Sequence, residues 1–264
     1  MRVAVVGLGL IGGSFLKASQ RAGHEVRGLH HGDSEGLADA ELVLVCLPPE
    51  AIVPWVREHA GSFARGAVVV DICGVKRKIM REMSGVEQIG WTFVGGHPMA
   101  GREVAGFENS LATLFDGASM ILTPPSGTGE ETLAPLKTYF ASLGFAMTVV
   151  TTPERHDEMI AFTSQLCHVI ATVYSRDARV ASSVGFSAGS YADMTRIATQ
   201  NASDWSALYS ANRDCLVEVL DGFLARFTEL RDAIAADDTG SVRRQIVEGT
   251  LAKQQENLSR KGRL

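Results

Sequence analysis

The sequence predicts an α/β domain with a mostly parallel sheet, followed by an all-α domain. Over residues 1–151, short runs rich in β-branched residues alternate with helical stretches. This alternation is typical of βαβ units whose strands are covered by helices on both faces. Over residues 152–264 this alternation stops, and apolar residues recur every three or four positions, which predicts helices. We therefore place a domain boundary near Thr151 and Pro153.

Seven runs in the first domain have the length and composition of strands. Each is short, and most are rich in the β-branched and apolar residues that buried strands favour. In chain order they are RVAVVG at 2–7, HEVRGLH at 24–30, ELVLVCLP at 41–48, AVVVDICG at 67–74, TFVGGHP at 92–98, SMILTP at 119–124 and AMTVV at 146–150.

Four stretches of the second domain carry the helical period, at 153–180, 192–201, 212–234 and 241–258. Several of them, such as CLVEVLDGFLARF at 215–227, are apolar on more than one side. This indicates burial against another helical layer. We expect that layer to belong to a second copy of the chain, so that the helical domain forms a homodimer.

The composition is that of a globular chain, with 264 residues of which 45% are hydrophobic. A net charge of -5 gives no basic excess, so we expect neither nucleic acid nor a membrane surface as a partner. The locally basic end, 260–264, is expected to be solvated. The four cysteines have no CxxC pair, which predicts neither a metal site nor disulfides. With no export leader and no membrane-spanning run, we expect a cytoplasmic protein.

The first strand runs directly into a glycine motif, GLGLIGGS, in which Gly7, Gly9 and Gly12 fit GxGxxG. Between a strand and a helix, this motif predicts a Rossmann-type dinucleotide-binding domain. Gly7 makes the tight turn, Gly9 lets a pyrophosphate approach, and Gly12 allows close helix packing. We expect the cofactor also to contact Leu10, Ile11 and Leu47.

The end of the second strand leaves the choice between NAD and NADP open. An NAD enzyme usually holds the ribose with an Asp or Glu at this point, but here the sequence is GLHHG, with His30 and His31 in the expected place. The histidines are able to contact a 2′-phosphate, and Asp33 is an alternative ribose acceptor. The segment 32–40 is too short for the usual helix before the third strand.

One histidine, His97, follows the fifth strand run in GGHPMAGRE at 95–103. We expect it at the apex of a loop at the carboxyl edge of the sheet, where open α/β folds bind ligands. From the sequence alone, such a histidine is more often structural or solvated than catalytic.

Several motifs together resemble the prephenate and arogenate dehydrogenase family over almost the whole chain. They are GLGLIGGS at 7–14, DICGVK at 71–76, GGHPMAGRE at 95–103, ILTP at 121–124, ERHDEMIAFTSQLCH at 154–168 and DMTRIA at 193–198. The resemblance implies oxidative decarboxylation of prephenate to 4-hydroxyphenylpyruvate, in tyrosine biosynthesis. Hydride passes from the hydroxyl-bearing ring carbon to NAD or NADP, and the ring then loses carbon dioxide and becomes aromatic.

The resemblance also implies roles for individual residues. It makes His97 the base that accepts the hydroxyl proton, a task for a neutral side chain with a pKa near the working pH. It places His168 in the active site as a second catalytic residue. Arg196 is expected to bind a substrate carboxylate with two parallel hydrogen bonds. The alternative is a salt bridge on the helix surface to Asp193, three residues back. Both are compatible if Asp193 orients Arg196 until the substrate arrives.

Other residues of the same motifs are expected around the substrate. Gly74 and Gln165 are expected at the substrate, although both depart from the family pattern, which commonly has DxxSVK and SHLPH. We do not expect Lys76, Glu103 and Asp193 to contact the substrate. We expect them to position the residues that do. Asp157 suits the positive N-terminus of its own helix.

Two alternatives remain open. Arogenate, which has an amino group in place of the keto oxygen, is the other candidate substrate. The absence of a serine at Gly74 also keeps open a dinucleotide-binding homologue without catalysis.

Overall fold

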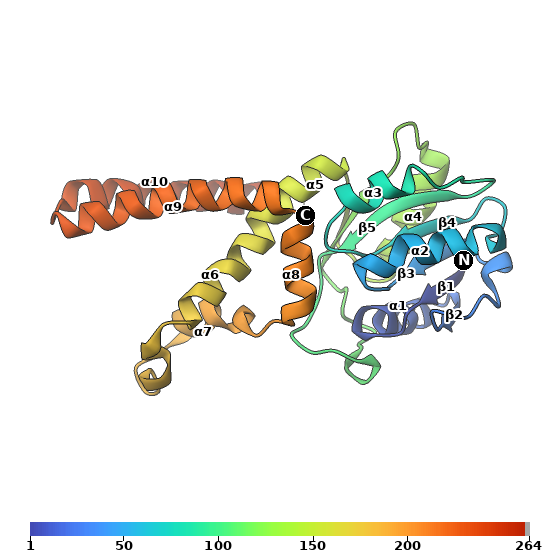
Figure 1. The fold of residues 1–264 in the computed structure, drawn as a ribbon, viewed down its shortest axis with the longest axis horizontal. Helices are drawn as coiled ribbons and strands as arrows, with labels where there is room; N and C mark the ends of the chain where they lie inside the picture. The colour runs from blue at the N-terminus through green and yellow to red at the C-terminus, as the bar shows by residue number, and fades with distance from the viewer. Residues whose placement is uncertain (262–264) are drawn as a thin grey trace. The chain divides into compact units, whose positions relative to one another are not determined.

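The computed structural model describes residues 1–261, so most of the basic chain end at 260–264 lies outside the described residues. Seven strands form one sheet in the order β2-β1-β3-β4-β5-β6-β7 (Figure 1). The strands are β1 Arg2–Val6, β2 Glu25–Leu29, β3 Leu42–Val45, β4 Val68–Asp71, β5 Thr92–Pro98, β6 Ser119–Thr123 and β7 Met147–Val150. Neighbouring strands are parallel except for β5 and β6, which are antiparallel. The predicted mostly parallel sheet is confirmed.

Two apolar layers cover the sheet, because alternate residues of each strand point to opposite faces. On one face Val43, Val45 and Val69 pack with residues of α2 Pro49–His59 and α3 Arg77–Met83. On the other, Leu42 and Leu44 pack with residues of α1 Leu10–Arg21 and α4 Glu130–Ser142. Between β2 and β3 only a 3₁₀ turn, Leu37–Asp39, is present, as the short segment predicted.

The strands end at Val150, and the chain continues in helices. These are α5 Pro153–Ile160, a π-helical turn Ala161–Gln165, α6 Leu166–Ser175, a 3₁₀ turn Ala178–Ser182, α7 Gly189–Thr195, a 3₁₀ turn Arg196–Ala198, α8 Ala202–Ala211, α9 Arg213–Ala235 and α10 Thr239–Lys261. By packing, the chain divides into two units, Met1–Arg213 and Asp214–Leu264. Helices α5 to α8 therefore belong to the same compact unit as the sheet. The boundary near Thr151, taken from the sequence pattern, stays a prediction.

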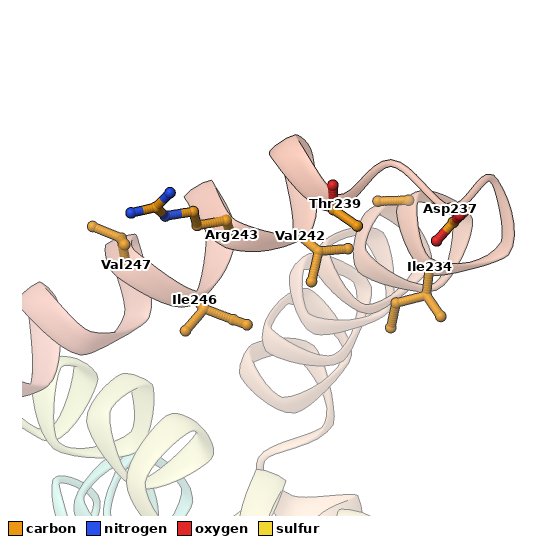
Figure 2. A pocket seen from close by; sticks show the side chains of 8 residues that line it. Ile234, Asp237, Thr239, Val242, Arg243, Ile246 and Val247 are labelled. Carbon is orange, nitrogen blue, oxygen red and sulfur yellow. The ribbon is translucent and has the colours of Figure 1, made fainter.

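The second unit is a pair of long helices, α9 and α10, joined by a short turn in which Asp237 has a φ of 52°. Asp238 caps α10, because its Oδ1 accepts the Ser241 amide at 3.0 Å. The end of α9 and the start of α10 enclose a largely apolar groove of about 380 Å³. Its lining includes Ile234, Val242, Ile246 and Val247, with Asp237 and Arg243 at its polar positions (Figure 2).

Candidate active site

His97 lies near the end of β5, not at the apex of a loop as the glycines and the proline suggested. Its backbone pairs with Ile121 of β6, and the strand continues to Pro98. The antiparallel β6 supplies this pairing, which the local sequence does not reveal. Gly96 is needed beside it, because a Cβ there would lie 2.5 Å from the Asp71 carbonyl oxygen.

The two ring nitrogens of His97 face different surroundings. Nδ1 lies 2.9 Å from Nε2 of His156, and Nδ1 of His156 lies 2.7 Å from Oδ1 of Asp157. On the other side, Nε2 of His97 would lie 3.8 Å from a Cβ built on Gly74. Burial, followed by the nearby His156 and Lys76, holds the pKa of His97 well below its ordinary value.

Asp157 is fully buried on α5 and is the fixed end of this line of side chains. Its Oδ1 also accepts the Lys76 amide at 2.7 Å, and its Oδ2 accepts the Arg77 amide at 2.9 Å. Burial acts to raise the pKa of Asp157, but the bonds from His156 and from these two amides outweigh it and lower the pKa. The carboxylate therefore caps the start of α3, a different helix from the one expected from the sequence.

Lys76 lies behind His97, fully buried, with its ammonium paired to the buried carboxylate of Asp71. Asp71 also accepts the amides of Cys73 at 2.9 Å and Gly96 at 3.3 Å. This pair ties the segment after β4 to β5. Burial first, and Lys76 among the charged groups nearby, lower the pKa of His156 against the opposing effect of Asp157.

A cavity of about 590 Å³ opens in front of His97, between β5, α5, α6 and α8. Six of the residues expected at the site line it, namely Gly74, His97, Glu103, Gln165, His168 and Arg196. Arg102, Asp204, Trp205 and Leu208 line it as well. Lys76 and Asp193 are outside this lining.

Arg196 lies at the start of the 3₁₀ turn after α7 and forms an ion pair with Glu103, not with Asp193. The orienting role expected of Asp193 is therefore corrected: Asp193 is exposed on α7, and Glu103, from the segment after β5, holds the guanidinium. A pair within one helix was the expectation from the sequence, whereas the fold brings together residues 93 positions apart.

His168 is half-buried on α6, and its ring lies against Trp205 with centroids 3.7 Å apart. Its Nδ1 lies 3.1 Å from the Ile197 carbonyl oxygen. Because that carbonyl only accepts, Nδ1 carries the proton and Nε2 is free to accept. Burial, helped by the charge of Arg196, lowers the pKa of His168.

Gln165 lines the cavity, but its amide is already bonded within the protein. Its Oε1 accepts from Asn212 at 2.8 Å, and its Nε2 donates to the Leu208 carbonyl at 3.3 Å. Asn212 is fully buried and also donates to the Asp157 carbonyl at 2.8 Å. Gln165 is thus positioned to brace α8 against the π-helical turn, rather than to offer a free amide to a ligand.

The glycine loop is closely packed at Gly7 and Gly12 and open at Gly9. Gly7 has a φ of 86°, and a Cβ on Gly12 would lie 1.9 Å from the Gly7 carbonyl oxygen, so both positions require glycine. Next to Gly9, by contrast, a Cβ would meet nothing within 4 Å. No side chain caps the start of α1, which leaves the amides at Leu10 and Ile11 for an anion. Leu47 packs beside Gly7.

The turn after β2 carries the residues that decide the ribose environment. His30 and His31 are both exposed, and the His31 carbonyl accepts from the Trp55 indole at 2.7 Å. Asp33 folds back onto the strand end, where its Oδ2 accepts the His30 amide at 2.8 Å. The Asp33 carboxylate, which the sequence analysis named as an alternative ribose acceptor, therefore lies at the end of β2 beside the two histidines.

Within residues 1–261, no cluster of three or more His, Cys, Asp or Glu side chains has the arrangement of a metal site. Over the same described part of the chain, no helix is long and apolar enough to cross a membrane.

Comparison with known families gives two consecutive matches. The nucleotide-binding domain of prephenate dehydrogenase matches residues 14–149, and the dimerization domain of prephenate dehydrogenase matches residues 152–248. The chain belongs to the prephenate dehydrogenase family. The family resemblance inferred from the motifs is thereby confirmed.

Individual relatives agree with this assignment. A cyclohexadienyl dehydrogenase from Zymomonas mobilis is 30% identical over 89% of this chain and 89% of its own length. A prephenate dehydrogenase from Bacillus subtilis is 26% identical over 89% of this chain and 71% of its own length.

Solved structures confirm the fold class. Arogenate dehydrogenase from Synechocystis superposes with a TM-score of 0.82 at 23% identity, over 97% of this chain and all of its own. Prephenate dehydrogenase from Aquifex aeolicus, in complex with hydroxyphenyl propionate and NAD+, gives a TM-score of 0.81 at 23% identity, over 97% of this chain and 98% of its own.

Four residues of this family member's site were not assigned their place from the sequence. The adjacent His156 and Asp157 stand out as a buried pair only once α5 is packed against α3. Trp205 faces His168 from a different helix. Asn212 has no local signal at all, because its three contacts come from three distant segments.

Proposed function

We propose that this protein is an NAD-dependent prephenate dehydrogenase, which converts prephenate to 4-hydroxyphenylpyruvate by oxidative decarboxylation. One observation carries the proposal: a half-buried histidine, His97, and an arginine, Arg196, line the same cavity. The first suits proton abstraction from a ring hydroxyl, and the second suits a carboxylate. We propose the reducing cytoplasm as its location, because the spacing of its four cysteines is not that of a disulfide framework.

Arg196 is the residue that we expect to hold a substrate carboxylate. Its guanidinium presents a planar fork that matches two carboxylate oxygens. Without substrate the guanidinium is paired with Glu103 at an exposed position, and such a pair is worth little. A substrate carboxylate is therefore able to compete for it. Arg102, which lines the cavity too, adds positive charge for the second carboxylate.

His97 is the base in this proposal. As the ring hydroxyl becomes a carbonyl, Nε2 of His97 accepts the hydroxyl proton. When the carbon–carboxylate bond breaks, its electron pair moves through the ring to the carbonyl oxygen and carbon dioxide leaves. The phenolate oxygen formed in this way then recovers the proton from His97. His168, whose Nε2 is free to accept a hydrogen bond, lies in the same cavity and is proposed to orient the substrate.

When bound, the nicotinamide supplies the acceptor for the hydride. Gly7, Gly9 and Gly12, with the amides at the start of α1, are proposed to hold the pyrophosphate. NAD is favoured over NADP because the turn 30–36 carries Asp33 and Glu35 but no Lys or Arg. The Asp33 carboxylate, held at the end of β2, would accept ribose hydroxyls and repel a 2′-phosphate.

Arogenate dehydrogenation is a second candidate, favoured by one observation. Asp204 of α8 lines the cavity, and a carboxylate is a suitable partner for the ammonium group that distinguishes arogenate from prephenate.

The assembly that we propose is a homodimer formed through the helical region. Large apolar side chains of α9 and α10 are exposed, among them Leu224, Phe227, Ile246 and Leu251. A surface of this kind is typical of a subunit interface. The family model that covers residues 152–248 describes a dimerization domain.

The test is an initial-rate assay of nicotinamide reduction with prephenate and with arogenate, each against NAD and NADP. We expect the highest kcat/KM with prephenate and NAD, and its loss in His97→Asn while NAD binding is retained. Asp33→Ser should raise the preference for NADP relative to NAD. Absence of turnover with both substrates, in folded protein that binds NAD, would overturn the proposed reaction.

A further inference from the structure

We propose that Asp157, acting through His156, fixes the tautomer of His97, so that Nε2 stays unprotonated and faces the cavity. Both are positioning residues in this proposal, which rests on the proposed function of His97 as the base. The structural basis is the unbroken line from the Asp157 carboxylate through both imidazoles to the cavity wall.

The first step is the state of Asp157. Its carboxyl group meets donors on every side: the amides of Lys76 and Arg77, the guanidinium Nε of Arg77 at 3.3 Å, and the ring of His156. Two of these donors are backbone amides, which cannot reverse their role. Asp157 is therefore an ionised acceptor, in agreement with its lowered pKa.

The second step is the orientation of His156. Because Asp157 can only accept, the His156 nitrogen beside it, Nδ1, must carry a proton. The pKa of His156 is lowered, chiefly by burial, so the ring is neutral and has a single proton. Its other nitrogen, Nε2, is then an acceptor, and it is this atom that lies 2.9 Å from Nδ1 of His97.

The third step transfers the same logic to His97. An acceptor at Nε2 of His156 requires a proton on Nδ1 of His97. Since His97 is also neutral, its Nε2 carries the lone pair, and this atom faces the cavity next to Gly74. The base is thus ready before the substrate arrives, with no rotation of the ring or exchange of protons.

With glycine at position 74, no hydroxyl group from this residue is present on the cavity side to orient His97. The orientation then depends on the side chains bonded to Nδ1. The atoms nearest to a Cβ built on Gly74 are the Leu208 methyl at 3.6 Å and the ring of His97. Neither glycine nor leucine offers a side-chain hydrogen bond with which to select a tautomer. The line of His156 and Asp157 supplies this selection, so the absence of a serine at Gly74 does not imply loss of catalysis.

Asp157→Asn tests the proposal because it reverses the direction of the hydrogen bonds through His156 to His97 while nearly preserving the shape of the side chain. Either orientation of the Asn amide sets its NH2 group against a backbone N–H. With the oxygen at the Oδ2 position only the hydrogen bond from the Lys76 amide is lost and both bonds from Arg77 are kept, so we expect the NH2 group to replace Oδ1. The NH2 group then donates to Nδ1 of His156, so the proton of His156 moves to its own Nε2. That Nε2 now donates to Nδ1 of His97, so the proton of His97 moves to its Nε2, the atom that faces the cavity. We expect kcat to fall by roughly 10²- to 10⁴-fold, as in other sites where an amide replaces the carboxylate behind a catalytic histidine.

His156→Gln is the second variant. Its side chain removes the link to Asp157 but imposes no wrong tautomer, because a glutamine amide is free to turn its oxygen to His97. We expect a smaller loss of kcat than in Asp157→Asn. A merely structural role predicts the opposite order, because losing a buried ring disturbs packing more than an isosteric change does. Asp116→Asn, which removes a carboxylate from an exposed pair with Arg21, is the matched control and should keep full activity.

The direct readout is the histidine tautomer, measured by long-range 1H–15N correlation on ¹⁵N-histidine-labelled protein without substrate. Peaks are assigned with His97→Asn and His156→Gln. We expect a protonated Nδ1 and an unprotonated Nε2 for both His97 and His156 in the parent, and the reverse in folded Asp157→Asn. A parent protein with protonated Nε2 on His97, or unchanged tautomers in Asp157→Asn, would overturn the proposal. This readout does not depend on turnover, so failure of the proposed reaction is distinguished from failure of the tautomer assignment.

Discussion

His97 has three surroundings that decide its protonation state: a buried site, the neighbouring His156 and the ammonium of Lys76. All three lower its pKa, with burial the largest cause. A base must be neutral to accept a proton, so these surroundings favour catalysis at neutral pH. The buried pair of Lys76 and Asp71 therefore also affects the protonation of His97. The Lys76 ammonium lies close enough to disfavour a positive charge on the His97 ring.

This arrangement predicts the pH dependence of the reaction. Protonated His97 is inactive, and its pKa lies well below 6.5, so kcat/KM should be constant from about pH 6.5 upward through neutrality. It should fall only at lower pH, as His97 gains a proton. Initial rates at saturating NAD from pH 4.5 to pH 8 measure the profile. An acid limb centred at or above pH 6.5 would contradict the prediction.

Arg196 gives the second prediction at this scale. Arg196→Ala removes charge-assisted hydrogen bonds to the substrate carboxylate, a loss of about 1.5 to 3 kcal/mol, or about 10- to 140-fold in affinity. Arg196→Lys keeps the charge but not the planar fork, so we expect a loss between those of the parent and the alanine variant. The measurements are KM for prephenate and Kd for NAD. Equal losses of substrate and NAD affinity would indicate damage to the fold instead.

At the residue scale, sequence motifs predict the two side chains with the most distinctive chemistry, His97 and Arg196, both of which line the cavity. Their partners are harder to predict because they come from other elements. Arg196 pairs with Glu103 across 93 positions and not with the nearby Asp193. His97 meets His156 across 59 positions. Spacing within one helix indicates local pairs, whereas these contacts depend on how α5 and α7 pack.

At the element scale, two glycines of the loop after β1 have different roles: Gly12 is needed for stability, and Gly9 for cofactor binding. Gly12→Ala would put a Cβ 1.9 Å from the Gly7 carbonyl oxygen, so we expect a loss of at least about 2 kcal/mol in the free energy of unfolding. Gly9→Ala would meet no protein atom within 4 Å, so its stability should stay within about 0.5 kcal/mol of the parent. Its Cβ instead occupies the space for the pyrophosphate, and we expect weaker NAD binding.

Urea unfolding and NAD titration, followed by fluorescence, measure the two effects. The prediction fails if Gly9→Ala binds NAD as tightly as the parent, or if Gly12→Ala unfolds at the same urea concentration. A loss of stability in both variants would mean that the loop serves the fold alone.

The elements themselves are largely predictable, since all seven strand runs appear as strands and the second half is helical. Two features are not. The strand β5 extends through His97 because antiparallel β6 supplies a partner, which the glycines and proline of GGHP conceal. The π-helical turn Ala161–Gln165, closed by the Leu166 amide on the Ala161 carbonyl, leaves no mark in the helical period. It places Gln165 where Asn212 and Leu208 hold it, and such turns are frequent at functional sites.

At the scale of the whole molecule, the question is what covers the long helices α9 and α10. Their exposed apolar side chains, including Phe227 at 60% and Leu224 at 57% exposure, lie within one unit of the chain. A single copy leaves this apolar surface in water, at a cost of roughly 25 cal/mol per Å². Pairing with a second copy removes that cost, and an interface made by the same patch on both subunits closes without further association.

The prediction is a dimer whose stability depends on this surface. Light scattering at micromolar concentration should give twice the chain mass of 28.3 kDa. The double variant Leu224→Glu with Phe227→Glu places two like charges in the interface of each copy, and their desolvation should yield monomers. Ile89→Glu, at an apolar side chain of the first unit with 76% exposure, is the matched control and should remain dimeric. If the double variant remains dimeric, the subunits associate through another surface; a monomeric parent would mean that α9 and α10 meet a different partner.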